Sequence, residues 1–371
     1  GFGVVTMSVL EQVIPEGYKQ TEVGIIPDDW NSASLHEICT FGGGTTPPRS
    51  QHDRYFVGGN NNWIKTTDLN NSLLEISEEQ VTDLAIAETG LKKHPVGSVL
   101  VAMYGGFNQI GRTGYITQPS SINQALVAVK PNPKKLHSYY LLSELNYNVD
   151  FWKGVASSSR KDPNITSNDV KNFKIALPSV EEQTAIANAL SDVDALLTKL
   201  EKLIAKKQAI KTATMQQLFP GRTRLPEFAN HPDGTPKGYK QTELGEIPED
   251  WEVKPLSELC DLKSGLGITS ESIDNSSKYR CYGGNGLRGY TNTFTHEGEY
   301  VLIGRQGALC GNIQHVSGKF FASEHALVST PKNIVSAYWL AVYLERMNLN
   351  QYSESSAQPG LSAEKLKILK L

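Results

Sequence analysis

Residues 179–218 carry the longest regular alternation of apolar and polar positions in the chain and contain neither Gly nor Pro. Their apolar residues recur at alternating steps of four and three, which is the spacing of a coiled-coil seam. The seam consists of Ile186, Leu190, Val193, Leu197, Leu200 and Ile204, and a second row of Ala189, Leu196, Leu203 and Ile210 runs beside it. Pro178-Ser179 precedes the stretch and Pro220-Gly221 follows it, which predicts one helix about 60 Å long. Because a single helix cannot bury two apolar rows against itself, we expect it to have a partner.

The sequence on either side of this predicted helix is duplicated. Residues 17–39 (GYKQTEVGIIPDDWNSASLHEIC) return as residues 238–260 (GYKQTELGEIPEDWEVKPLSELC), a shift of 221 positions. A period of this length indicates a duplicated domain, since solenoid and propeller units are much shorter. In each copy we expect a turn at Ile-Pro-x-Asp-Trp, then a short amphipathic helix, with Trp30 or Trp251 covering a core.

Short runs rich in β-branched and aromatic residues follow in each copy and are punctuated by glycine: VLVAMYGG and GRTGYIT, then YVLIGRQG and GNIQHVSG. Such runs predict the strands of a small, irregular, mostly antiparallel sheet. Residues 96–100 and 123–127 align with residues 297–301 and 324–328 at a shift of 201. The duplication therefore extends through the predicted sheets.

Helical stretches are expected at residues 138–151 and 334–349, and the ends of the two copies, 165–175 and 361–371, align at a shift of 196. The predicted fold class is α+β, with two duplicated domains of small irregular β-sheets plus helices, separated by a long coiled-coil helix. The predicted boundaries are residues 7–178 for the first domain, 179–220 for the spacer helix, 221–237 for a Pro- and Gly-containing link, and 238–371 for the second domain.

Composition limits the possible functions but does not change the predicted fold. The 371 residues are 39% hydrophobic and 20% charged, which is ordinary for a globular protein. The net charge of −3 neither favours nor excludes nucleic acid, because a basic groove can lie within an acidic protein. No apolar run approaches the length of a membrane span. The four cysteines, Cys39, Cys260, Cys281 and Cys310, form no C-x-x-C pair, which predicts reduced thiols in a cytoplasmic protein.

The duplicated opening segment, the run Leu177–Ile186 (LPSVEEQTAI) and the Gln217–Phe219 end of the long helix resemble the specificity subunits of type I restriction-modification enzymes. Residues 282–290 (YGGNGLRGY) and 356–362 (SAQPGLS) of the second copy add to this resemblance, which covers essentially the whole chain. It implies two target-recognition domains, each reading one half of a split, asymmetric DNA site. In that family an antiparallel pair of long helices holds the domains apart, and here one of the two helices is expected to be missing.

The same resemblance implies a subunit without catalytic residues, metal ligands or a cofactor of its own. Two modification subunits carrying S-adenosylmethionine would dock on it, and restriction subunits would add translocation and cleavage that depend on ATP and Mg. Double-stranded DNA is the expected ligand, and no membrane partner is expected. The two apolar rows of the lone helix also predict a homodimer formed through that helix.

Base reading needs Arg, Lys, Asn and Gln on exposed loops, where glycine lets the backbone approach the groove. The candidates in the first domain are Arg49, Asn61, Lys65, Tyr104, Asn108, Gln109, Arg112, Arg160 and Lys161. Those in the second domain are Arg280, Asn285, Arg288, Arg305, Gln306 and Asn312. These residue types are also common in plain turns, so base contact, phosphate contact and a turn role stay open for each. Asn123-Gln124 and Glu324-His325, at matching places, either read bases or satisfy buried backbone groups.

Three enzyme-like patterns carry little weight. Residues 284–289 satisfy G-x-G-x-x-G, but no apolar strand precedes them and no helix-forming run follows. Pro232-Asp233 with residues 252–254 (EVK) fits a loose nuclease pattern, but its first half lies in the predicted link. The eight histidines show no metal-ligand spacing, and the N/D-P-P-Y/F loop of DNA amino-methyltransferases is missing. The alternative to DNA recognition is a non-enzymatic coiled-coil scaffold that binds protein partners through two related domains.

Overall fold

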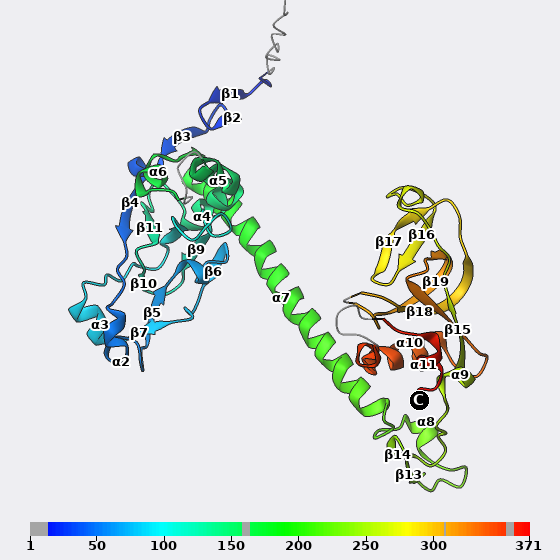
Figure 1. Cartoon of the computed structure of the whole chain (residues 1–371). Helices are drawn as coiled ribbons and strands as arrows, with labels where there is room; N and C mark the ends of the chain where they lie inside the picture. The colour runs from blue at the N-terminus through cyan, green and yellow to red at the C-terminus, as the bar shows by residue number, and fades with distance from the viewer. Residues whose placement is uncertain (1–13, 158–163, 308, 354–359) are drawn as a thin grey trace, which may run out of the picture. The chain divides into compact units, whose positions relative to one another are not determined.

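The computed structural model describes residues 14–157, 164–307, 309–353 and 360–371 (Figure 1). The chain divides into two compact units, Gly1–Leu203 (unit 1) and Ile204–Leu371 (unit 2). Each unit contains β-sheet and helices, and the long helix α7 (Val180–Leu218) lies between the two sheets in the chain, which confirms the predicted fold class. None of the helices in the described ranges is long and apolar enough to cross a membrane.

The strands of unit 1 are β1 (Tyr18–Thr21), β2 (Gly24–Pro27), β3 (Asn31–Ser34), β4 (Cys39–Gly43), β5 (Asn61–Ile64), β6 (Ser72–Leu74), β7 (Gln80–Val81), β8 (Val99–Ala102), β9 (Thr113–Ile116), β10 (Ser121–Ile122), β11 (Leu126–Pro131) and β12 (Lys174–Leu177). Its helices are α1 (Leu35–Ile38), α2 (His52–Tyr55), α3 (Asp83–Glu88), α4 (Ser138–Tyr147), α5 (Val149–Ser157) and α6 (Ser167–Asn172), with 3-10 turns η1 (Arg49–Gln51) and η2 (Thr66–Asp68).

The strands of unit 2 are β13 (Tyr239–Thr242), β14 (Gly245–Pro248), β15 (Cys260–Ser264), β16 (Tyr279–Gly283), β17 (Gly286–Thr291), β18 (His296–Gly304), β19 (Ile313–Ala322) and β20 (Ala326–Pro331). Its helices are α8 (Pro226–Ala229), α9 (Leu256–Leu259), α10 (Ala337–Arg346) and α11 (Ala363–Lys367), with 3-10 turns η3 (Ser270–Ser272) and η4 (Leu349–Tyr352).

The main sheets of the two units share a strand order. Unit 1 has β4-β11-β8-β9-β6, and unit 2 has β15-β20-β18-β19-β16-β17. The first four strands correspond one to one and are antiparallel in both, whereas β6 and β16 join their neighbours in parallel. The duplication read from the sequence is therefore a duplication of the sheet, and the sheets are mostly antiparallel, as predicted.

The strand register corrects the alignment of the two copies. Pro131 pairs with Cys39 in unit 1, and Pro331 pairs with Cys260 in unit 2. Because Cys39 and Cys260 are equivalent at the shift of 221, β11 and β20 correspond at a shift of 200 and not at the predicted 201. A shift of 201 would match Val127 with a residue on the wrong face of unit 2.

The cores show why the register matters. Val127 of β11 faces the helices of unit 1, and its counterpart Leu327 faces those of unit 2, whereas Val328 lies on the opposite face. A slip of one residue in a strand exchanges the two faces of a sheet, so the cores fix the register. In the same way Leu100 pairs with Ala128 and Leu302 pairs with Val328, which places β8 and β18 at a shift of 202.

The helices that cover one face of each sheet are shorter than predicted. The stretch expected at 138–151 is two helices, α4 and α5, which meet at Asn148, and the stretch expected at 334–349 contains α10. Leu141 and Leu145 of α4 are fully buried, as are Leu340 and Leu344 of α10. The i, i+4 spacing of these leucines gives each helix one apolar stripe facing its sheet.

The short amphipathic helix predicted in each copy is present as α1 and α9. The backbone N–H of Leu35 donates to Phe173 O at 2.9 Å, and that of Leu256 donates to Leu369 O at 2.7 Å. In both units the tail of the copy therefore returns to its opening segment. Ser34 and Glu37 form a capping box at the start of α1, which satisfies two backbone N–H groups at that end.

Trp251 lines a hollow of unit 2 together with the core residues Leu259 and Leu371, whereas Trp30 pairs with the long helix. Trp30 is half-buried, and its indole Nε1 donates to Glu182 Oε2 in the first turn of α7 at 3.1 Å. A Cβ atom on Gly221, just after α7 ends, would lie 3.4 Å from the ring of Trp251. Trp30 is thus tied to the start of α7, and Trp251 lies beside the segment that follows α7.

Segment 221–237 is ordered against the β13–β14 hairpin. The guanidinium of Arg224 donates two hydrogen bonds to the carboxylate of Asp250, at 2.8 and 3.0 Å, and lies over the ring of Trp251. Lys237 Nζ donates to the same carboxylate at 2.8 Å. These hydrogen bonds, from Arg224 first and then from Lys237, hold the pKa of Asp250 well below its ordinary value.

Candidate nucleic-acid interface

A polar turn lies at the same place in both units, directly before the second strand of the main sheet, which is β11 in unit 1 and β20 in unit 2. In unit 1 this is the β10–β11 turn, residues 123–125. The N–H of Asn123 donates to Ile64 O at 2.9 Å, and the N–H of Met103 donates to Ala125 O at 2.9 Å. The turn is thus fixed through its backbone at both ends.

The β19–β20 turn of unit 2, residues 323–325, repeats this backbone arrangement. The N–H of Ser323 donates to Tyr282 O at 2.8 Å, and the N–H of Arg305 donates to His325 O at 2.9 Å. Two equivalent backbone hydrogen bonds therefore hold each turn, although the turns share no side chain: Asn-Gln-Ala in unit 1 corresponds to Ser-Glu-His in unit 2.

One glycine in each unit permits this arrangement. A Cβ atom on Gly44 would lie 2.1 Å from Ile122 O and 2.2 Å from Asn123 O. A Cβ atom on Gly265 would lie 2.3 Å from Ser323 O. A side chain at either position would push the turn away from the strand, so glycine is required for this close approach.

Side chains from neighbouring loops reach both turns. In unit 1 the hydroxyl of Thr46 donates to Gln124 Oε1. In unit 2 the side chains of His325 and Gln306 form a hydrogen bond of 3.0 Å. Arg305, beside Gln306, donates from Nη1 to the hydroxyl of Ser264 at 2.9 Å.

The β16–β17 hairpin brings Arg288 to the turn of unit 2. A Cβ atom on Gly283 would lie 2.5 Å from Arg288 Cδ and 3.4 Å from Ser323 Oγ, so the arginine stem crosses this glycine beside the turn. Arg288 is exposed, as is Asn285 at the tip of the hairpin. We call the group of Ser264, Arg288, Arg305, Gln306, Ser323, Glu324 and His325 the unit 2 cluster.

The remaining unit 2 candidates lie elsewhere. Arg280 is exposed on β16, where hydrogen bonding to Tyr282 raises its pKa. Asn312 lines a different hollow of about 320 Å³ with Leu309 and Asn350. The structure therefore groups Arg288, Arg305 and Gln306 and leaves Arg280 and Asn312 outside the cluster.

In unit 1 two of the residues predicted to contact DNA form ion pairs with acidic residues of the same unit. The guanidinium of Arg49 forms an ion pair with Glu79 and lies 4.3 Å from the ring centroid of Phe56. Lys65 Nζ lies 3.3 Å from Glu79 Oε2 and 3.4 Å from Glu78 Oε2. The hydrogen bond from Arg49 lowers the pKa of Glu79, so the carboxylate stays charged and holds both cations.

Asn61 is also occupied, because its amide donates to Asp83 Oδ1 at 2.9 Å and to Val81 O at 3.1 Å. Tyr104 and Asn108 are exposed in the loop between β8 and β9, and Gln109 and Arg112 are half-buried there. The two remaining candidates, Arg160 and Lys161, lie outside the described residues, as does most of the 356–362 run.

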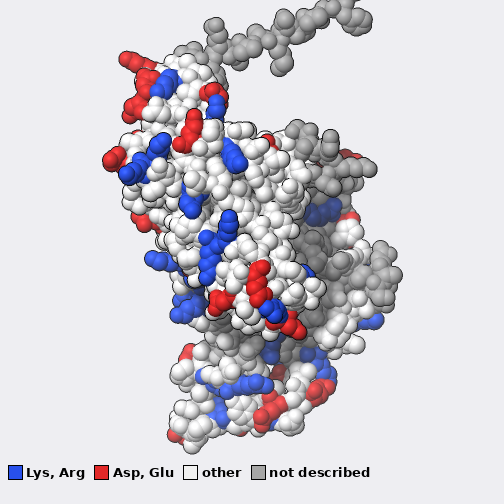
Figure 2. Space-filling model, turned by 90° about the vertical axis from the view of Figure 1, so that its left-hand side faces the viewer, with Lys and Arg blue, Asp and Glu red and all other residues white. Residues whose placement is uncertain are grey.

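The motif reading gave no individual role to Thr46, Ser264 and Ser323. The signal that could have found the first two is the pair of equivalent glycines, Gly44 and Gly265, which lie close to them in the sequence. On the face shown in Figure 2, Lys and Arg lie interspersed with Asp and Glu on a largely uncharged surface. No group of three or more His, Cys, Asp or Glu suited to a metal occurs within the described ranges.

Helix α7 presents a second candidate surface. Gln183 anchors its start: the amide donates to Lys135 O at 3.0 Å and accepts from the N–H of His137 at 2.8 Å. Ala187 is buried in the core of unit 1 and the half-buried Ile186 packs against it, so the first residue of the predicted seam already has contacts within unit 1. The apolar residues beyond it remain 43% to 57% exposed: Leu190, Val193, Leu196, Leu197, Leu200, Leu203, Ile204 and Ile210.

Comparison with known proteins identifies a family. A profile described as "Type I restriction modification DNA specificity domain" matches residues 27–212 and 248–371. These segments begin 221 positions apart, which is the shift of the opening repeat. The profile therefore matches both copies.

Individual relatives agree with the profile. The chain is 29% identical over 345 residues to the type I restriction enzyme EcoprrI specificity subunit of Escherichia coli, covering 91% of this chain and 82% of the relative. It is 29% identical over 247 residues to the putative type I restriction enzyme MjaX specificity subunit of Methanocaldococcus jannaschii, covering 65% of this chain and 55% of the relative. Its fold is similar to the crystal structure of a type I restriction-modification S subunit from M. genitalium, with a TM-score of 0.64, 18% identity, and coverage of 92% of this chain and 83% of that chain.

Proposed function

Because the chain belongs to the family of type I restriction-modification DNA specificity domains, and is thus a non-catalytic specificity subunit, we propose that its two units read the two halves of a bipartite, asymmetric DNA target. The observation that carries this proposal is the pair of equivalent turns at residues 123–125 and 323–325. They share a backbone arrangement and carry different side chains. A common scaffold with different polar groups suits two different half-sites, since base edges are distinguished by donor and acceptor patterns.

The reading units of this proposal are residues 7–178 and 238–371, with residues 179–220 as the spacer and 221–237 as the link. A continuous helix is a stiff spacer, with about 1.5 Å of rise per residue, so α7 would set the gap between the half-sites. The hydrogen bond from Trp30 to Glu182 supports a fixed attachment of the first domain at the start of α7.

The exposed apolar rows of α7 support docking of other proteins. In the proposed complex two modification subunits bind S-adenosylmethionine and dock on this chain, and restriction subunits add ATP- and Mg-dependent steps in the cytoplasm. A helix that pairs with α7, from a second copy of the chain or another source, would cover rows left about half exposed. This need for a protein partner accompanies DNA reading and does not replace it.

Exchange of one unit tests the proposal. Residues 40–170 are replaced by the corresponding part of a relative, and the complex with its modification subunits is produced in a restriction-deficient host. Sequencing that detects methylated bases then gives the recognised motif. One half of the motif should change and the other half should stay. A motif that changed in both halves, or in neither, would refute independent reading by the two units.

A further inference from the structure

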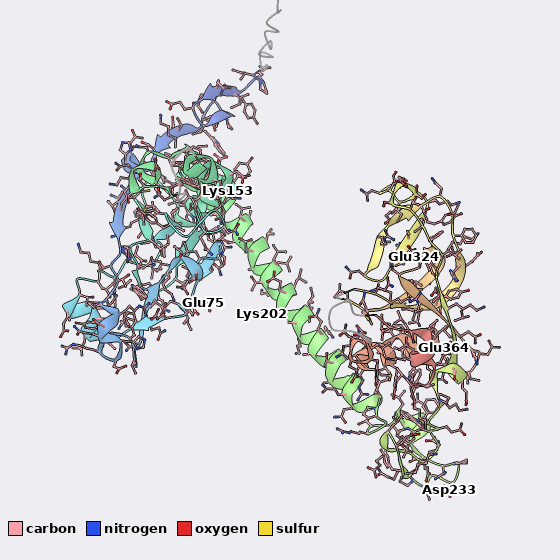
Figure 3. All side chains as sticks on the ribbon, viewed as in Figure 1. Glu75, Lys153, Lys202, Asp233, Glu324 and Glu364 are labelled. Carbon is pink, nitrogen blue, oxygen red and sulfur yellow. The ribbon has the colours of Figure 1, made fainter. Side chains whose placement is uncertain are left out.

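We propose that Glu324, on the β19–β20 turn, is a specificity-determining residue that accepts a hydrogen bond from the N4 amino group of a cytosine in the half-site read by unit 2. This inference rests on the proposed function and deepens it. Glu324 lies where β19 gives way to β20, next to the β16–β17 hairpin (Figure 3). It belongs to the unit 2 cluster.

The two oxygens of this carboxylate differ. Oε1 lies 3.5 Å from His325 Nε2. Oε2 is covered by protein and has no hydrogen-bond partner among the described residues, although the side chain as a whole is 42% exposed. A covered acceptor without a donor is costly, and because the side chain as a whole is 42% exposed, a rotation of the carboxylate would bring this oxygen to the surface and to a donor that arrives with a ligand.

A structural role in the turn does not account for Glu324. Its equivalent in unit 1 is Gln124, whose side-chain oxygen accepts from the hydroxyl of Thr46 on a neighbouring loop. The backbone of the unit 2 turn is held by Tyr282 and Arg305 without help from the Glu324 carboxylate. The acid therefore adds a charged acceptor that the turn itself does not require.

The chemistry of DNA narrows the choice of donor. A carboxylate is repelled by phosphates, so an acid within a DNA-reading cluster lowers affinity unless it reaches a base. In the major groove the cytosine N4 amino group is a donor for Glu or Asp. Arg288 extends beside the same turn, and Arg is the common partner of guanine O6 and N7. An acidic and a basic side chain at one turn therefore suit a half-site that contains a G·C pair at this position.

Glu324→Gln tests the inference, because it keeps the size of the side chain and removes its charge. The complex with modification subunits is produced in a restriction-deficient host, and methylated motifs are read by sequencing. Recognition should weaken at one cytosine of the second half-site by about 10- to 150-fold, the range of one hydrogen bond that involves a charged group. Adenine should be accepted there, since a side-chain amide pairs with adenine N6 and N7. The first half-site should stay unchanged.

Glu297→Gln on β18 is the matched control. Glu297 loses the same charge, lies in the same sheet and pairs with Lys319 at 3.5 Å, away from the turn. Its motif should equal that of the unaltered chain. A thermal unfolding midpoint within a degree or two for both variants would establish that each fold is intact.

Three results would overturn the inference: a second half-site without cytosine on either strand, an unchanged motif in Glu324→Gln, or equal weakening of every position. The unit exchange separates this failure from failure of the proposed function. If exchange of residues 40–170 alters one half of the motif while Glu324→Gln alters nothing, bipartite reading stands and the role of Glu324 falls. If the exchange fails as well, the proposed function falls with it.

Discussion

Helix α7 should drive self-association of the isolated chain, and the double variant Leu197→Glu, Leu200→Glu should abolish it. The two leucines are 53% and 45% exposed, so roughly half of each side chain stays in contact with water. Complete burial of a leucine contributes about 1.5–3 kcal/mol, so covering the exposed half contributes about 0.75–1.5 kcal/mol. In a symmetric dimer four such side chains are covered, which amounts to about 3–6 kcal/mol.

Loss of this contribution raises the dissociation constant of the dimer at least about 100-fold, and the cost of burying four carboxylates raises it further. Gel filtration with light scattering over the micromolar range gives the mass directly. The unaltered chain should show a dimer that dissociates on dilution, and the double variant should stay monomeric.

The variant Asn188→Glu, Ala195→Glu is the control, because it adds the same two charges at exposed positions on the opposite face of α7. It should dimerise like the unaltered chain. A monomeric mass for the unaltered chain at every concentration would refute the reasoning. If the double variant Leu197→Glu, Leu200→Glu still dimerises, the dimer contact lies outside this part of α7.

Two further predictions concern unit 2. Arg288→Ala or Arg305→Ala should weaken binding to the specific site by about 1–3 kcal/mol, while the affinity for random DNA and the salt dependence of binding stay nearly unchanged. An equal loss of affinity for both DNAs, with the slope of log K against log salt reduced by about one, would show that the residue contacts a phosphate. Asp250→Asn should make segment 221–237 sensitive to proteases, whereas the equivalent Asp29→Asn should change nothing. Because the folded-state pKa of Asp250 is lowered, its stabilising effect is complete at neutral pH and is lost only as the pH falls below the ordinary range of aspartate.

The sequence predicted what periodicity and repetition determine. The helix at 179–218 appears as α7, and the repeated opening segments appear as equivalent turns and short helices, since both depend on local patterns. The register between copies was misjudged by one residue because glycine-rich runs offer several similar alignments, and only the buried faces of β11 and β20 separate them.

The candidate site was predicted only in part, for a physical reason. Arg49 and Lys65 looked free because their acidic partner, Glu79, lies far away in the sequence and is brought near by folding. Gly44 and Gly265 mark a close approach at equivalent positions, but the carbonyls that they approach belong to a turn distant in the sequence and cannot be identified from it. Side-chain pairing across a sheet is tertiary information, and a single sequence carries no direct record of it.

The register of the two sheets also limits how such proteins can exchange parts. The span from Leu100 to Ala128 is two residues longer than the equivalent span from Leu302 to Val328, and both keep their inner faces inward. A one-residue shift within a paired strand would exchange its faces. Loops between strands change length freely, since the span from Cys39 to Val101 is 19 residues longer than that from Cys260 to Ile303 and all four residues lie in the helix-side cores. Recombination should therefore exchange whole strands together with their loops, and crossovers in the shared opening segments meet this condition, so new specificities should be inherited as whole units.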